Sequence, residues 1–309
     1  MLQNMRTHCV GRFLIELPLE FRQRHSAVDS AADATFYFGH DADFKTIDVS
    51  VVGEGLDTAA FDSRVKQRAE TLSVQTNYEK NASMLVAEQV WAPGQILLRY
   101  YATPDIADSF VHELHLLVDG AHVVARTKSF DAPVAPAESR LRALVPHVSR
   151  VSDPARANGF CLGPVAVSVD SDYEEADLRF GAGAEGQPLM LAIEFSTFGQ
   201  ANGEPSLIER GEANLAGLGV NPKALKKGAL SLAGLPAEQW LGRFDEGGAR
   251  QHGFYAETTG KSQSKSEPKI HLELFTGGQL ADGGYAASPL DDEQAMRLWD
   301  GIITTLRRR

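Results

Sequence analysis

The segment closest to a known catalytic motif is 112–115, which reads His-Glu-Leu-His. Histidine and glutamate are typical of zinc proteases, where two histidines four positions apart share one face of a helix. Here the histidines are three apart, and Leu114 and Leu116 alternate with polar residues as in a β-strand. An odd spacing on a strand sends the two rings to opposite faces. We therefore predict no metal site, and we expect Glu113 and His115 to lie on a solvated strand face.

Two glycine-rich segments resemble functional motifs in their letters alone. Residues 181–186 satisfy the Gly-x-Gly-x-x-Gly spacing, but residues 189–195 alternate as a strand, where a dinucleotide site needs a helix whose N-terminus meets the pyrophosphate. We interpret 181–186 as a hairpin loop. Residues 228–234 lack the spacing of a nucleophile elbow and lead into no helix, so we interpret Ser231 as a strand or turn residue. No cofactor is predicted.

The two cysteines do not form a catalytic pattern either. Cys9 and Cys161 each begin a Cys-x-Gly tripeptide, 152 positions apart in a chain of 309 residues. Neither has a histidine that the sequence can place beside it. We interpret each as a small packing residue at the mouth of a strand. A disulfide between them would need the two domain entrances to be adjacent.

The doubled Cys-x-Gly begins a repeat that runs through the chain. After it, apolar residues alternate at 13–17 and again at 165–169, at the same offset of 152. Two later strand patterns, which begin near residues 35 and 47, recur at offsets of 142 and 144. Surface connections tolerate such changes in length better than packed elements do. Shared positions are mostly apolar, whereas charged residues and histidines mostly differ.

Helical spacing follows these strands in both halves. In the first half the stripe is Phe61, Val65, Ala69 and Leu72, and in the second it includes Leu207, Ile208 and Leu215. The final helix carries Ala295, Trp299, Ile302 and Leu306, with Asp291 and Asp292 near its start and the arginines 307–309 at a frayed C-terminal end that suits the helix dipole.

A Glu-Gln pair stands beside a tryptophan in each half, at 88–89 and at 238–239. We match these two segments to each other and expect a hydrogen-bonding role at a strand end.

We predict an α+β fold of two tandem domains with similar topology. The boundary falls near residue 153, giving domains of residues 1–153 and 154–309, each large enough for its own core. Runs of strands followed by helices predict a mainly antiparallel sheet with helices packed on one face.

The composition excludes several classes of function. With 43% hydrophobic and 23% charged residues and no long apolar run, it is that of an ordinary globular protein. The net charge of −11 argues against nucleic acid as a partner, because such binding depends on lysines and arginines. It favours a cationic protein surface instead. The first residues contain no hydrophobic leader segment, which read literally predicts a cytoplasmic protein.

Residues 9–18 resemble the opening of the immunity proteins that neutralise lipase effectors of the bacterial type VI secretion system. Residues 160–163, followed by a valine-rich strand, resemble the start of that family's C-terminal domain. The resemblance covers essentially the whole chain. It implies a protein that is not an enzyme and that binds a lipase or phospholipase, obstructing substrate access or lid opening. It also implies a periplasmic location, normally reached with an export leader.

The contact residues are not part of these motifs, so we look for them in loops that differ between the halves. Tyrosines supply rigid amphipathic area and carboxylates supply electrostatic steering. The candidates are Tyr100, Tyr101, Asp105 and Asp108 in one half and Tyr255, Lys261 and Lys265 in the other. Two alternatives stay open: a hydrolase with its site in the interdomain cleft, and a periplasmic chaperone or binding protein, which would bind many clients.

Overall fold

The computed structural model describes residues 4–39, 45–130, 134–183, 188–200, 203–218, 222–280 and 282–309. Its chain forms two compact units. The N-unit consists of His25–Ser152 and Ala157–Asp172, and the C-unit consists of Met1–Arg24, Asp153–Arg156 and Tyr173–Arg309. The units follow the predicted halves except that each takes a short segment from the other half. The domain boundaries 1–153 and 154–309 describe where the sequence repeats, and they stay a prediction.

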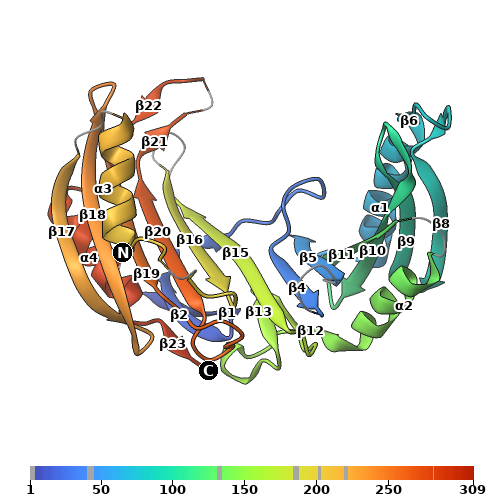
Figure 1. Cartoon of the computed structure of the whole chain (residues 1–309), viewed down its shortest axis with the longest axis horizontal. Helices are drawn as coiled ribbons and strands as arrows, with labels where there is room; N and C mark the ends of the chain where they lie inside the picture. The colour runs from blue at the N-terminus through green and yellow to red at the C-terminus, as the bar shows by residue number, and fades with distance from the viewer. Residues whose placement is uncertain are drawn as a thin grey trace. The chain divides into compact units, whose positions relative to one another are not determined.

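Each unit is built around six antiparallel strands, and the order of the strands is the same in both. In the N-unit the order is β8 (Leu85–Ala92), β9 (Gln95–Thr103), β10 (Ile106–Val118), β11 (Ala121–Phe130), β5 (Lys45–Gly53) and β4 (Ala34–Phe38). In the C-unit it is β17 (Lys223–Leu232), β18 (Leu235–Glu246), β19 (Ala249–Thr258), β20 (Lys269–Thr276), β16 (Leu189–Ser196) and β15 (Tyr173–Ala182) (Figure 1). The predicted α+β class and antiparallel sheets are confirmed.

The two Cys-x-Gly hairpins are exchanged between the units. The first hairpin, β1 (Met5–Gly11) and β2 (Phe13–Pro18), belongs to the C-unit, where β2 pairs with β23 (Arg307–Arg308). The second, β13 (Phe160–Leu162) and β14 (Val165–Val167), belongs to the N-unit, where β14 pairs with β12 (Val148–Arg150). Each hairpin therefore completes the unit that the other half of the sequence mainly forms.

Short strands extend this framework. In the C-unit, β3 (Arg22–Gln23) pairs with β15, and β21 (Gly278–Gln279) pairs with β22 (Tyr285–Ala286). In the N-unit, β6 (Thr76–Asn77) pairs with β7 (Ala82–Ser83). Among the described residues, 3₁₀ turns lie at Val145–His147 and Pro154–Arg156.

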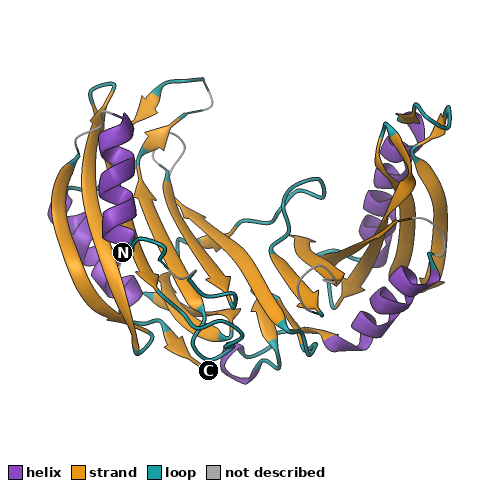
Figure 2. Ribbon diagram, in the orientation of Figure 1, coloured by secondary structure: helices purple, strands orange, loops and turns teal. Residues whose placement is uncertain are grey.

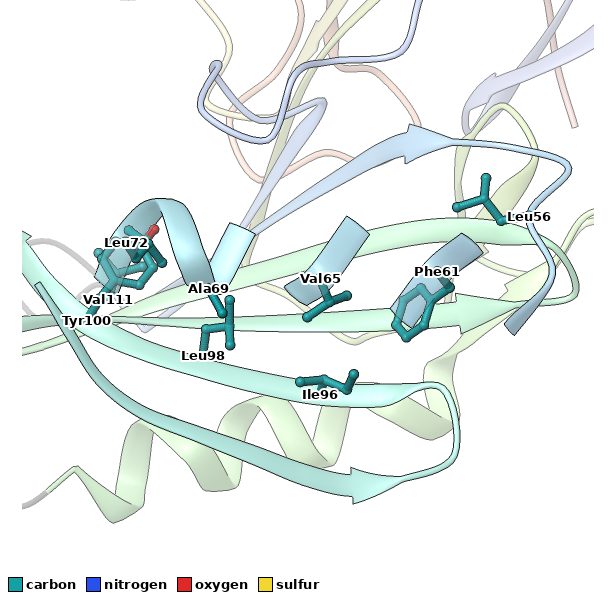
Figure 3. Close-up of a cluster of buried hydrophobic side chains, with 9 residues drawn as sticks. All are labelled: Leu56, Phe61, Val65, Ala69, Leu72, Ile96, Leu98, Tyr100 and Val111. Carbon is teal, nitrogen blue, oxygen red and sulfur yellow. The ribbon is translucent and has the colours of Figure 1, made fainter. Parts of the chain in front are cut away.

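The four α-helices of the described residues are α1 (Thr58–Val74) and α2 (Ala135–Leu144) in the N-unit, and α3 (Leu207–Leu218) and α4 (Asp292–Ile303) in the C-unit (Figure 2). The predicted stripe of α1 is confirmed, because Phe61, Val65, Ala69 and Leu72 are all buried. They pack on Ile96, Leu98, Tyr100 and Val111 of β9 and β10 (Figure 3).

The two helices of a unit lie on opposite faces of its sheet, where the sequence predicted one face. Neighbouring residues on a strand point to opposite faces. On β9, Arg99 bonds Glu138 of α2, while Tyr100 bonds Arg68 of α1. On β18, Glu238 accepts the amide of Ile208 at the start of α3. Its neighbour Gln239 accepts the indole N–H of Trp299 on α4.

Two sequence matches are corrected by this arrangement. Segment 88–89 lies on β8, which corresponds by its place in the sheet to β17, whereas segment 238–239 lies on β18. The two Glu-Gln pairs therefore lie on strands that do not correspond, because the equivalent of β8 is β17, the neighbour of β18 in the sheet. The predicted hydrogen-bonding role holds for Glu238, Gln239 and Gln89, which accepts an indole N–H from Trp91 at 3.3 Å, but all three lie inside a strand and not at its end.

The terminal arginines are not a helix end. α4 begins at its predicted start, where Asp291 forms a capping box with Gln294, but it ends at Ile303. Arg307 and Arg308 continue as the short strand β23. The spacing of apolar residues does not show where α4 ends, because the strand that follows it forms only by pairing with β2 from the start of the chain.

The cysteines are buried as predicted, with Cys9 1% and Cys161 0% exposed. Both are also disulfide-bonded, a possibility that the sequence left open. None of the described helices is long and apolar enough to span a membrane.

Candidate partner-binding surface

Glu113 on β10 is the centre of a buried charged network in the N-unit. Its carboxylate accepts from Arg68 of α1 at 3.0 Å and from Arg126 of β11 at 2.8 Å. The Tyr100 hydroxyl and His115 also bond it, each at 3.0 Å. Burial acts to raise the Glu113 pKa, but the hydrogen bond from His115 and the adjacent guanidinium groups hold it well below its usual range.

The predicted solvated face at Glu113 and His115 is therefore wrong, since both side chains are 0% exposed. Alternation along β10 correctly placed the two residues on one face. It could not show that α1 covers this face while α2 covers the other.

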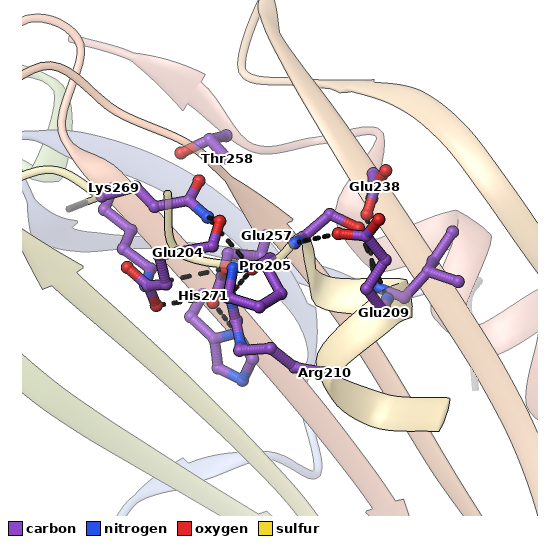
Figure 4. A network of polar contacts seen from close by, with 12 residues as sticks. Glu204, Pro205, Glu209, Arg210, Glu238, Glu257, Thr258, Lys269 and His271 are labelled. Carbon is purple, nitrogen blue, oxygen red and sulfur yellow. Dashed lines mark hydrogen bonds and ion pairs between the residues drawn. The ribbon is translucent and has the colours of Figure 1, made fainter. Parts of the chain in front are cut away.

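The C-unit contains a corresponding network around Glu257 on β19, whose place in the sheet matches that of β10 (Figure 4). Arg210 of α3 donates to this carboxylate at 2.6 Å. His271 of β20 lies directly across the strand pair and bonds it at 3.0 Å, as Arg126 lies across from Glu113. In both units an arginine of the unit's first helix thus binds a buried glutamate on the strand that is third in the sheet order, β10 or β19.

This repeat of charged residues is contrary to the prediction that charged positions differ between the halves. The signal was present in the offsets. Arg68 and Arg210 are 142 positions apart, and Glu113 and Glu257 are 144 apart, which are the offsets of the matched strands.

His271 gives the C-unit network a pH dependence. Burial lowers its pKa, but hydrogen bonds to Glu257 and Glu273 outweigh this and raise it to about 9. For Glu257, burial raises the pKa, while His271, Arg210 and Lys269 together lower it to about 2. At neutral pH His271 is therefore an imidazolium between two carboxylates.

We predict that folding stability declines as the pH rises from 6.5 through 9. The folded protein binds the His271 proton more tightly than the unfolded chain does, so the stabilisation is complete below about pH 6.5 and is lost as the pH passes 9. The shift corresponds to about 3 kcal/mol. Urea unfolding at several pH values should show this slope in the wild type and not in His271→Gln, with His147→Gln at an exposed site as the control. An equal slope in His271→Gln would contradict the assignment.

The candidates Tyr100, Tyr101, Asp105 and Asp108 gather at one end of the N-unit. Asp105 and Asp108 are exposed around the β9–β10 turn. Tyr101 is half-buried with its ring 5.3 Å from that of Phe110. Tyr100 is only 9% exposed, so its hydroxyl serves the internal network. Both tyrosines line a cavity of about 450 Å³.

Exposed apolar side chains surround the same turn. Val74 is 81%, Tyr78 72% and Ile106 46% exposed. The Tyr78 amide donates to the carbonyl of Pro104 at 2.7 Å, which ties the β6–β7 hairpin to the turn. We call this surface the N-unit tip; it comprises Val74, Tyr78, Tyr101, Asp105, Ile106 and Asp108. An apolar patch with acidic residues beside it is typical of a protein-binding surface.

The remaining candidates lie in the C-unit. Tyr255 is half-buried on β19, with its ring 5.7 Å from Phe275, and burial together with Glu273 raises its pKa to about 12. In the loop that follows, Lys261 is 67% exposed and pairs with Glu267 at 2.7 Å. Lys265 is 29% exposed and lies 3.6 Å from Glu174. The lysines thus belong to one loop, and Tyr255 to the strand before it.

A serine, a histidine and an aspartate also come together in the C-unit, which the sequence did not predict. His252 bonds Asp292 at 3.1 Å and Ser288 at 3.2 Å. Ser288 is 7% exposed, and its hydroxyl also donates to the carbonyl of Leu290. Thr276 lies closer to the same histidine nitrogen, at 2.7 Å. Because this hydroxyl is buried and engaged, the cluster anchors the start of α4 and does not present a nucleophile.

The described part of the chain holds no group of three or more His, Cys, Asp or Glu side chains that could bind a metal ion. Its buried charges are paired internally, and the N-unit tip combines exposed apolar area with carboxylates. A repeated α+β framework with an exposed patch of this kind favours a role in binding another protein.

The comparisons identify the family. The model of the Tle cognate immunity protein 4 C-terminal domain matches residues 154–309, half of the chain, and the chain belongs to this family. The resemblance to type VI secretion immunity proteins is thereby confirmed.

Solved structures share the fold over the full length. The immunity protein TplEi of the type VI secretion system of Pseudomonas aeruginosa, in its apo form, is 21% identical with a TM-score of 0.67, covering 99% of this chain and 97% of that one. The structure of the Tle4–Tli4 complex includes a chain that is 19% identical with a TM-score of 0.68, covering 100% and 99%. TplEi complexed with an "L" peptide gives 19% and 0.65, with 100% and 99% covered. No curated protein sequence matches significantly.

Proposed function

We propose that this protein binds and neutralises a cognate lipase or phospholipase effector of the type VI secretion system, without itself catalysing a reaction. The observation that carries the proposal is membership of the Tle cognate immunity protein 4 family. A solved protein of the same fold is in complex with Tle4, which supports a protein partner of that class. Neutralisation follows from obstructing substrate access or the opening of the effector's lid.

The N-unit tip supplies one contact surface, through Tyr101, Asp105 and Asp108. The second surface includes Tyr255, Lys261 and Lys265 of the C-unit. Tyr100 contributes indirectly, because its hydroxyl donates to the buried Glu113 beneath the N-unit tip. We place the protein in the periplasm, because its cysteines are disulfide-bonded and that compartment is oxidising.

Titration of the lipase encoded beside the gene tests the proposal. We expect lipase activity to fall to zero at a one-to-one ratio, with no hydrolysis by this protein alone. Unchanged lipase activity at excess protein would refute the function.

The N-unit tip has its own test. In Asp105→Asn/Asp108→Asn, binding should weaken by about tenfold, mainly through slower association, because exposed carboxylates steer a cationic partner. The matched control is Asp62→Asn/Glu88→Gln, which removes two exposed carboxylates elsewhere on the N-unit. Surface plasmon resonance at two salt concentrations measures both variants. Equal affinities for the two would exclude the N-unit tip from the interface.

A further inference from the structure

The two halves differ in the segment that leads from the hairpin into the sheet. Fifteen residues, 19–33, connect β2 to β4, whereas five residues, 168–172, connect β14 to β15. This ten-residue difference accounts for the drift of the repeat offset from 152 to 142. We call residues 25–33, the part of the longer connection that belongs to the N-unit, the strap.

The strap lies across the α1 side of the N-unit sheet. The Val28 carbonyl accepts from Arg126 of β11, and Asp29 pairs with Arg68 of α1 at 2.6 Å. Asp33 accepts the backbone amide of Val51 on β5 at 2.7 Å. The strap thus covers β11 and β5 beside α1, and it lines a cavity of about 350 Å³ next to that helix.

The corresponding face of the C-unit is formed by β20, β16 and β15, beside α3. Glu194 on β16 lies directly between His271 of β20 and Asp177 of β15 in the strand register. Its side chain is exposed, while those of Asp177 and Glu273 are 32% and 28% exposed. Within the described residues, the short connection 168–172 supplies no strap for this face.

The face is acidic with an apolar part. Asp177 pairs with Arg179 at 2.6 Å and Glu273 bonds His271, but Glu194 forms no ion pair with any described residue. Burial and the carboxylates of Asp177 and Glu273 raise the Glu194 pKa, against the opposing effects of His271 and Arg179. A cation placed here would relieve this repulsion. Met190, Ala192 and Phe275 on the same face are half-buried and offer apolar contact.

We infer that the face of β15, β16 and β20 is a docking surface for an extended, lysine- or arginine-bearing segment of the partner protein. The segment takes the place on the C-unit that the strap takes on the N-unit. The strap shows that this side of the repeated sheet accepts a chain segment beside the first helix. In the N-unit, Arg126 and Arg68 bind the strap, which carries the acidic Asp29. The C-unit face has the opposite charge, so the partner's segment carries lysines or arginines.

The inference rests on the proposed function, because the partner is the effector. Charge reversal at Glu194 tests it. We expect Glu194→Lys to bind the lipase encoded beside the gene at least tenfold more weakly, with slower association and a smaller dependence on salt. Glu194→Gln should weaken binding by about threefold. The matched control Glu293→Lys, at a side chain 76% exposed on α4, should stay within twofold of the wild type.

The two failures are distinguishable. If the wild type binds and Glu194→Lys binds equally well, the docking surface is refuted and the immunity function stands. If the wild type does not bind or inhibit the lipase, the function itself fails. A thermal melt confirms folding of each variant, and if Glu194→Lys melts early, the comparison of Glu194→Gln with Glu293→Gln decides.

Discussion

A fragment of residues 154–309 is expected not to fold, although the family model matches those residues alone. The fragment lacks β1 and β2, whose side chains Phe13, Ile15 and Leu17 are at most 1% exposed in the C-unit. Phe13 stacks on Phe195 at 5.5 Å, and β2 is the partner of β23. Losing three fully buried large side chains removes more stabilisation than a domain usually has to spare. Circular dichroism and urea unfolding should show no cooperative transition.

Restoring the hairpin should rescue the fragment. A chain of residues 173–309 followed by a flexible linker and residues 4–24 contains both long segments of the C-unit and lacks Asp153–Arg156. The Arg309 amide donates to the carbonyl of Arg12 at 3.2 Å, at the turn of the β1–β2 hairpin, whereas residue 4 lies at the open end of that hairpin. The linker must therefore span the seven residues of β1, about 25 Å. We expect this permuted chain to unfold cooperatively. A cooperative transition in 154–309 alone would show that the exchanged hairpin is dispensable.

Replacing Glu113 is expected to have the largest effect of any single substitution considered. In Glu113→Gln, the guanidinium groups of Arg68 and Arg126, which are 14% and 13% exposed, lose their buried counterion. Breaking a buried ion pair by removing one partner costs about 3–5 kcal/mol, because the other charge stays desolvated. The free energy of unfolding should fall by that amount in urea denaturation.

Two controls frame this measurement. Glu88→Gln, at an exposed position on β8, should change stability by less than about 0.5 kcal/mol. Glu257→Gln should destabilise the C-unit in the same way, since Arg210 donates to a carboxylate that is 7% exposed. If Glu113→Gln costs under 1 kcal/mol, water must satisfy the arginines and the network is not a stabilising element.

Local patterns predicted the elements well and their surroundings poorly. The α1 stripe and the capped start of α4 follow from spacing that any environment would preserve. The same alternation along β10 does not show which face of the sheet a helix covers, so the prediction that Glu113 faces solvent is wrong. The hairpin exchange could not be predicted, because each hairpin has the same pattern whichever unit it joins.

The candidate site shows the same division. Asp105 and Asp108 are exposed as a partner contact requires, because a turn between two strands lies at the surface. Tyr100 and Tyr101 are neighbours on β9, so only one of them can face α1, and Tyr100 does. Whether these residues contact the effector stays a prediction. The β15–β16–β20 face had no sequence signal, because its acidic residues come from three separate strands.

The pairing of β2 with β23 also sets an order of events during biosynthesis. Phe13 meets Arg308 and Leu14 meets Arg307, so the first hairpin must wait while nearly three hundred further residues are made. Contacts between such distant segments form slowly, because the intervening chain must first be closed into a loop. The growing polypeptide therefore cannot complete its C-unit on the ribosome. This delay leaves the C-unit incomplete until translation has passed residue 308, which would suit the export that the proposed periplasmic location requires.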